Sequence, residues 1–287
     1  MNEIGLIIRR AVRKTRRMLL SAGLLAQPSL DFSNRLTSAK HVDAMLARIA
    51  DVVEGWLSRQ AVLPDLAPID VRREVRDFYA AYLSSPFRET AGGSRFNKLL
   101  WLALLAKALR PTLVIDSGTY RGASAWALSL GAPDATILSF DIDLSRLQLR
   151  QPNCEYFQHD WSRHDLASFD LSRALCYFDD LVDQVRRLLE AKARRIPFAV
   201  FSDDYPVSYF ANATPSPARL PKLEFIDDPS LAHGDVLEWT WHGAPRRWIV
   251  DQGYLAQGRA AIKAAERLPD LGAITGIRVL SPKVVAL

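Results

Sequence analysis

Residues 114–124 have the sequence VIDSGTYRGAS, which joins an apolar run to a turn with two glycines and then to AWALSLG. A short apolar run that ends at a glycine is typical of a buried strand, and the residues after the turn are typical of a buried helix. A strand, a glycine turn and a helix in this order indicate an α/β fold.

The same order recurs along the chain after residue 111. The apolar runs are TLVIDS, TILSFD, CEYFQ, ALCYFD and FAVFSD, and helical patterns such as DDLVDQVRRLLEAKAR lie between them. Strands that alternate with helices form right-handed βαβ units and a parallel sheet that is buried on both faces. We therefore predict a Rossmann-like α/β fold with a doubly wound, mainly parallel sheet.

Four of the five apolar runs end in an aspartate, at Asp116, Asp141, Asp179 and Asp203. In open α/β sheets, ligands bind outside the carboxyl ends of the strands, so these side chains converge on one edge. The sequence predicts an acidic binding site at this edge.

The turn after the first strand has Gly118 and Gly122 with three residues between them, which differs from the three-glycine pattern of dinucleotide-binding folds. S-adenosylmethionine presents an amino acid, a sulfonium and a nucleoside, and it needs less backbone contact than a pyrophosphate. We predict that this turn binds it. Asp116 would face the ammonium group, while Ser124 would cap the next helix and help to receive the carboxylate.

The other predicted cofactor contacts are Thr119 and Tyr120 in the same turn, Asp141 for both ribose hydroxyls and Asp160 for the adenine edge. Two alternatives stay open at this point. One is a tight turn that binds no ligand, because glycine-containing βα turns are common. The other is NAD in place of S-adenosylmethionine.

The motif DSGTYRGAS, followed by SFDID, YFDD and FSDDYP, resembles the class I S-adenosylmethionine-dependent methyltransferases. Within them it resembles the metal-dependent O-methyltransferases of the macrocin, novobiocin-sugar and cephalosporin-tailoring (cephalosporin hydroxylase-like) group. The resemblance covers roughly residues 85–210. It departs from the group in three places: an aspartate begins the glycine motif where glutamate is usual, YFDDLVDQ replaces a D-G-D pattern, and QHDW replaces a turn of small residues.

The resemblance implies a magnesium ion bound by Asp179, Asp203 and Asp204, with Asp180 and Asp183 as rivals for the ligand after the fourth strand. A divalent cation would lower the pKa of an acceptor hydroxyl, and Asp179 would then act as the general base. The alternative is structural. In that case the acids after the fourth strand belong to the first turn of a helix, and the paired acids after the fifth form a solvated turn.

We therefore expect an O-methyltransferase that acts, with Mg²⁺, on a hydroxyl of a sugar in a glycan or a glycosylated natural product. The sugar rests on the resemblance alone. One alternative is a methyltransferase with a non-sugar acceptor. The other is a non-catalytic subunit of a glycan-assembly complex that keeps the fold.

The net charge of +5 lies entirely in the first 20 residues, which hold six basic residues and one acidic residue. The rest of the chain is neutral, which argues against a nucleic-acid partner. Residues 1–20 are amphipathic, and three interpretations stay open: contact with a membrane surface, an export signal, or a solvated helix that packs on the body or on a partner subunit. A homo-oligomer is a further expectation, because the amphipathic helix 38–60 could pair with a copy of itself. We expect a cytoplasmic protein that is peripheral to the membrane at most, with two unpaired thiols, Cys154 and Cys176.

The predicted domains are a helical N-terminal segment, residues 1–90, and a cofactor-binding domain, residues 91–287. Helical spacing predicts helices over 38–60, 70–85, 95–109 and 252–268. Residues 205–235 hold five prolines and are predicted to form a lid. The β-rich segments VLEWTWHG, RRWIV and GIRVLSPKVVAL are expected to complete the one sheet.

Overall fold

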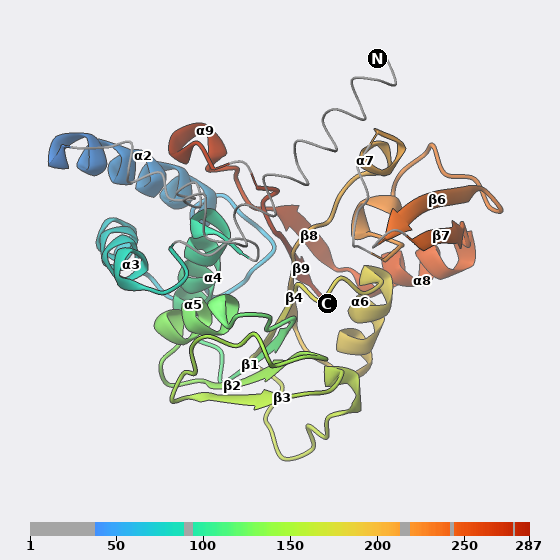
Figure 1. Cartoon of the computed structure of the whole chain (residues 1–287), viewed down its shortest axis with the longest axis horizontal. Helices are drawn as coiled ribbons and strands as arrows, with labels where there is room; N and C mark the ends of the chain where they lie inside the picture. The colour runs from blue at the N-terminus through green and yellow to red at the C-terminus, as the bar shows by residue number, and fades with distance from the viewer. Residues whose placement is uncertain (1–37, 89–93, 213–218, 242–243, 278) are drawn as a thin grey trace, which may run out of the picture.

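A seven-stranded, mainly parallel sheet forms the centre of the protein, with helices on both faces (Figure 1). The structure, a computed structural model, describes residues 38–88, 94–212, 219–241, 244–277 and 279–287. The predicted amphipathic segment 1–20 lies outside the described residues. None of the described helices is long and apolar enough to cross a membrane.

The strand order is β3-β2-β1-β4-β5-β9-β8, and β9 alone runs antiparallel to its neighbours. The strands are β1 (Leu113–Ser117), β2 (Thr136–Phe140), β3 (Cys154–Phe157), β4 (Ala174–Phe178), β5 (Phe198–Phe201), β8 (Ala264–Arg267) and β9 (Lys283–Ala286). The order of strands reverses at β1, between β2 and β4. Such a switch point is where open α/β sheets bind ligands.

Alternate residues of the strands supply two separate cores. In β1, Val114 packs toward the helices α2 (Ala39–Leu57), α3 (Val71–Ser84), α4 (Phe96–Leu109), α5 (Ala123–Gly131) and α9 (Gly272–Thr275). Its neighbours Leu113 and Ile115 pack toward α6 (Gln184–Ala193) and α8 (Gln252–Ala261) on the other face. Because both faces are covered, the strands are apolar throughout, as the sequence predicted.

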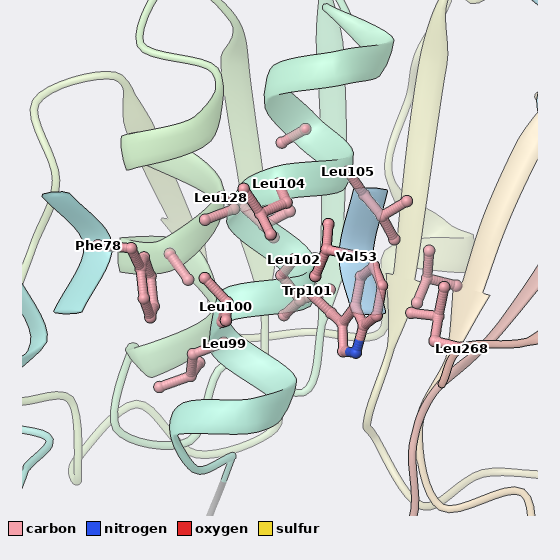
Figure 2. Packing of buried hydrophobic residues seen from close by; sticks show 14 of the residues in the cluster. Val53, Phe78, Leu99, Leu100, Trp101, Leu102, Leu104, Leu105, Leu128 and Leu268 are labelled. Carbon is pink, nitrogen blue, oxygen red and sulfur yellow. The ribbon is translucent and has the colours of Figure 1, made fainter. Parts of the chain in front are cut away.

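Helix α4 lies at the centre of the first core. Its sequence, FNKLLWLALLAKAL, is apolar on every side, which is typical of a fully buried helix. Figure 2 shows its leucines pointing in several directions, with side chains from α2, α3, α5 and the residue after β8 around them. Trp101 of α4 is 1% exposed and meets Trp56 of α2 edge to face, with ring centroids 5.4 Å apart.

The predicted N-terminal segment does not form a core of its own. Helices α2 and α3 are capped by Ser38 and Asp70, the first residues of the predicted ranges, whose side chains accept from His41 N and Arg73 N. Both helices bury their apolar residues in the core that α4 shares with the sheet. The described part of the segment is thus a second layer of helices over one face.

Three expectations for the C-terminal part need correction. The segments VLEWTW and APRRWI form a separate hairpin, β6 (Val236–Trp241) with β7 (Ala244–Ile249). The helix predicted over 252–268 ends at Ala261, because residues 264–267 pair with β9 at the sheet edge, and this pairing outweighs their helix propensity. Within the predicted lid, residues 220–231 include five buried apolar side chains and therefore belong to the second core. The two cysteines are unpaired.

The crossing of α4 and α5 generates a stability prediction at Gly131. A Cβ at this position would lie 2.2 Å from the carbonyl oxygen of Ala103, a backbone atom that cannot move cheaply. We expect Gly131→Ala to lower the free energy of unfolding by about 2 kcal/mol or more, as overpacking of a core does. Chemical denaturation measures this change.

The matched control is Gly55→Ala in the middle of α2, where the added Cβ meets only the flexible end of Arg59, at 3.1 Å. Alanine favours the helix, so the control should raise stability by about 0.5–1 kcal/mol. Equal effects of the two substitutions would contradict the close packing of α4 on α5.

Candidate functional site

A pocket of about 740 Å³ opens at the carboxyl edge of the sheet, around the switch point between β1 and β4. This volume lies in the range typical of small-molecule sites. Its walls come from the turn after β1, the ends of β2, β4 and β5, the start of α6 and the start of α4. The structure thus brings the ends of four strands together, as the strand-end aspartates predicted.

The conformation of the glycine turn is constrained by adjacent backbone segments as well as by the pocket. Gly118 has φ 105°, and a Cβ there would lie 2.6 Å from the backbone of Asp179. Gly122 has φ 89°, and its Cβ would lie 2.8 Å from the carbonyl oxygen of Leu149. Gly118 lines the pocket and Gly122 does not. Both positions therefore need glycine for reasons of packing and backbone conformation.

Asp116 lies beneath the turn in a buried hydrogen-bond network. Ser139 Oγ donates to Asp116 Oδ2 at 2.6 Å, and the hydroxyls of Ser139 and Thr119 are also 2.6 Å apart. The other oxygen of Asp116, Oδ1, is buried and accepts no hydrogen bond from the described residues. Burial raises the pKa of Asp116 to about 6, although the hydroxyls of Ser139 and Ser124 act in the opposite direction. A buried carboxylate with one unpartnered oxygen is what an approaching ammonium group would complete.

Ser124 departs from part of its predicted role. It lines the pocket and is 4% exposed, but Gly122 occupies the N-cap of α5 and no side chain caps this helix. The predicted cap is therefore corrected, because the glycine turn runs directly into the helix. The predicted contact of Ser124 with a carboxylate stays a prediction.

Asp141 connects the end of β2 to the glycine turn. Its Oδ2 accepts from the backbone N–H of Tyr120 at 2.7 Å, and its Oδ1 accepts from the N–H of Asp143 at 3.1 Å. Both oxygens retain further lone pairs, and the residue lines the pocket. Beside it, Ile142 lines the same wall and is 82% exposed. A carboxylate and an exposed apolar side chain thus stand together at one end of the pocket.

Asp160 lines the pocket, but an arginine already binds its carboxylate. Arg187 of α6 is 2% exposed and donates to both oxygens, at 2.9 and 3.0 Å. Burial alone would raise the pKa of Asp160, yet the hydrogen bonds and charge of Arg187 hold it well below its usual range. The contact of Asp160 with adenine stays a prediction, and its side chain would have to serve both partners.

Asp179 and Asp203, at the ends of β4 and β5, face a lysine. Lys98, in the first turn of α4, donates from Nζ to Asp203 Oδ1 at 2.7 Å and to Ser202 Oγ at 2.5 Å. Asp179 Oδ2 accepts from Ser94 Oγ at 3.1 Å. The lysine and both carboxylates line the pocket.

The two carboxylates differ in proton affinity. Burial raises the pKa of Asp179, and the positive charge of Lys98 only partly opposes this effect. Burial acts in the same way on Asp203, but the charge and hydrogen bond of Lys98 outweigh it and lower its pKa. Burial would lower the pKa of Lys98, yet Asp179 and Asp203 together raise it. When the environment moves the pKa values of two neighbouring acids in opposite directions, the acid with the higher pKa suits proton transfer.

The predicted magnesium site does not fit these residues. Asp204 is fully buried and turned away from the pocket, where it pairs with Arg267 at 3.2 Å and Lys283 at 2.8 Å. Its role as a metal ligand is therefore corrected: the two cations of β8 and β9 hold its carboxylate behind the site. Among the described residues, no three His, Cys, Asp or Glu side chains are grouped so that they could bind a metal ion.

The two rival acids are also occupied. Asp180 accepts from Ser117 Oγ at 2.6 Å and from Arg187 Nε at 2.8 Å. Asp183 caps α6 and accepts from Tyr254 OH at 2.8 Å. The structural alternative, in which an acid serves the first turn of the helix, is thus confirmed for Asp183.

Sequence reasoning missed Ser94, Lys98, Ile142 and Arg187. Lys98 had a signal, because a lysine near the start of a largely apolar helix needs a buried partner. Arg187 had none, since an arginine in a helical pattern is usually solvated.

No known protein-family model matches the sequence, and no curated protein matches it. Among solved structures, a putative O-methyltransferase from Klebsiella pneumoniae is 14% identical, covers 83% of this chain and 95% of its own, and has a TM-score of 0.41. The N-terminal domain of EvdMO1, solved in the presence of SAH and D-fucose, is 19% identical, with coverage of 76% and 97% and a TM-score of 0.42.

A putative S-adenosylmethionine-dependent methyltransferase from Listeria monocytogenes is 14% identical, with coverage of 67% and 98% and a TM-score of 0.40. The strand order, with its antiparallel β9, is that of a Rossmann-like α/β fold with a doubly wound, mainly parallel sheet, as the sequence predicted.

Proposed function

We propose that this protein is an S-adenosylmethionine-dependent O-methyltransferase. The observation that carries the proposal is a contact between the turn after β1 and the end of β2. There the backbone N–H of Tyr120 donates a hydrogen bond to Asp141 in the wall of the pocket. This contact brings the glycine turn, Asp141 with its remaining lone pairs and the exposed Ile142 together at the switch point of the sheet. S-adenosylmethionine, a nucleoside and an amino acid linked through sulfur, has groups that suit all three.

Two parts of the cofactor have a suitable group in the wall of the pocket, and a third group, Asp116, is fully buried behind that wall. Asp141 would accept from the ribose hydroxyls, and Ile142 offers an apolar surface to the adenine ring. Asp116 has the unpartnered oxygen that suits an ammonium group. These assignments use the residues predicted from the sequence and add Ile142.

The acids at the other end of the pocket suit the transfer step. When bound, the cofactor supplies an electrophilic methyl group on a sulfonium. The acceptor hydroxyl would lose its proton to Asp179, whose raised pKa suits a general base. The acceptor oxygen then forms its bond to the methyl carbon while the bond from that carbon to sulfur breaks, and the sulfur keeps the electron pair.

We infer that the acceptor is a hydroxyl of a sugar, in a glycan or a glycosylated natural product. The support is the resemblance of the strand-end motifs to sugar-modifying O-methyltransferases. Magnesium is not carried into this proposal, because Asp204 is committed to Arg267 and Lys283. Release of S-adenosylhomocysteine with a panel of glycans, set against catechols and amines, tests the acceptor class. Turnover only with non-sugar acceptors would contradict it.

Calorimetric titration of S-adenosylmethionine tests the cofactor. We expect micromolar binding, about −8 kcal/mol, and at least tenfold weaker binding by Asp141→Ala. The loss arises because a hydrogen bond to a charged group contributes about 1.5–3 kcal/mol. Asp170→Ala is the matched control, since this exposed acid bonds within its own loop and lies outside the pocket. Tighter binding of NAD than of S-adenosylmethionine, or no effect of Asp141→Ala, would sink the proposal.

Asp116→Asn should act in opposite directions on stability and on binding. Because the pKa of Asp116 is about 6 in the folded protein and near 4 when unfolded, its ionisation at neutral pH opposes folding. The substitution should therefore raise the free energy of unfolding at pH 7, by up to about 3 kcal/mol. It should also weaken binding of the cofactor, because the charge that faces the ammonium group is lost.

The ionisation of Asp116 should make the stability of the protein depend on pH. A raised carboxyl pKa stabilises the folded state fully below about pH 4, and this contribution is lost as the pH rises through about 6. The difference in stability between Asp116→Asn and the wild type should therefore grow across that window. Denaturation at several pH values measures it. A variant that is less stable than the wild type at pH 7, or one that binds the cofactor equally well, would contradict the role of Asp116.

A further inference from the structure

Lys98 stands where the resemblance places a metal ion, at the edge formed by the ends of β4 and β5. It is the third residue of α4, and it is 6% exposed. Its ammonium group donates to Ser202 Oγ and Asp203 Oδ1, at 2.5 and 2.7 Å. The charge of Asp179 also acts on it. A buried lysine is rare unless it is paired, and this one is paired with Asp203, an acid of the predicted metal site that lines the pocket.

The neighbouring acids are neutralised by other protein cations. Asp180 pairs with Arg187 at 2.8 Å, and Asp204 pairs with Arg267 and Lys283. A second buried lysine, Lys222, is 1% exposed and lies within the field of Asp203 and Asp204. Crowded carboxylates need a cation to offset their repulsion, and here side chains supply it. Little negative charge is left for a divalent ion to neutralise.

The chemistry of an ammonium group fits the position. Lysine carries three N–H donors, of which Ser202 and Asp203 take two. The third remains for an oxygen in the pocket, which Lys98 lines. A positive charge aimed at an oxygen that becomes negative lowers the barrier to its reaction. Because α4 is packed on every side, this charge is held in place before an acceptor binds.

We propose that the ammonium group of Lys98 takes the place of a divalent cation in this protein, so that methyl transfer proceeds without a metal ion. The proposal rests on the function proposed above. Lys98 would contact the acceptor oxygen as its proton passes to Asp179 and the methyl group passes from sulfur to oxygen. Lys98 keeps its proton and its charge throughout the step, and the proton of the acceptor passes to Asp179. The step therefore needs no further reactant.

Electron paramagnetic resonance with Mn²⁺ tests the proposal on the full-length protein, with and without S-adenosylmethionine. We expect no saturable Mn²⁺ site in the wild type. In Lys98→Met the side chain keeps its length and loses its charge, so Asp203 loses its ion pair and only the charge of Lys222 still acts on this acidic edge. We expect this variant to bind Mn²⁺ at least tenfold more tightly than the wild type.

Lys107→Met is the matched control, because Lys107 lies on the same helix, is partly exposed and pairs with Glu74 at 3.5 Å, away from the pocket. It should leave Mn²⁺ binding unchanged. One equivalent of Mn²⁺ bound by the wild type and lost in Asp203→Asn would overturn the proposal. So would a folded Lys98→Met protein, checked by circular dichroism, that gains no Mn²⁺ site. If that variant does not fold, the wild-type titration still decides.

Failure of this inference can be told apart from failure of the proposed function. Binding of S-adenosylmethionine is measured by calorimetry on the same wild-type sample. Cofactor binding together with a stoichiometric Mn²⁺ site would overturn the role of Lys98 and leave a metal-dependent methyltransferase. No cofactor binding would overturn the function. Once an acceptor is found, turnover that is unchanged by EDTA is the expected result, and turnover abolished by EDTA and restored by Mg²⁺ would contradict it.

Discussion

Burial of α4 on every side is the constraint on which the site depends. The helix packs against α2, α3, α5 and the sheet (Figure 2). Its first turn therefore has one position relative to the ends of β4 and β5. A lysine carried by that turn must therefore reach Asp203 or remain buried without a partner. The second outcome would cost several kcal/mol or force the lysine to lose its proton. The packing that stabilises the core therefore also requires the ion pair between Lys98 and Asp203 in the pocket.

The charges at the carboxyl edge of the sheet form pairs rather than a cluster of acids. Arg187 holds Asp160 and Asp180, the cations of β8 and β9 hold Asp204, and Lys98 holds Asp203. Asp179 is the exception, because its nearest polar contacts are the hydroxyls of Ser94 and Tyr177. Pairing lowers the proton affinity of its neighbours and leaves Asp179 with a raised pKa. The arrangement therefore singles out one carboxylate for proton transfer.

Asp116 shows that the pocket retains some unfavourable burial. A carboxylate that is fully buried and half satisfied opposes folding at neutral pH. The turn above it also needs a positive φ at Tyr120, 47°, as well as at both glycines. Unfavourable features of this kind collect where a ligand completes the structure. They mark the end of the pocket near β1 as the place where binding energy would be recovered.

The sequence by itself determined the layers, the parallel strands and the edge at which the acids meet. These follow from local patterns, since an apolar run, a glycine turn and a helix specify a βα unit without help from distant residues. It also identified Asp141 and Asp179, because the residue after a buried strand must emerge at its carboxyl end. Tertiary structure alone decided which acids stay available, because Lys98, Arg267 and Lys283 lie more than 60 residues along the chain from the acids that they hold. Packing across the fold determines which cation lies beside a carboxylate. The spacing of residues in the sequence does not contain the distance between the two groups in space.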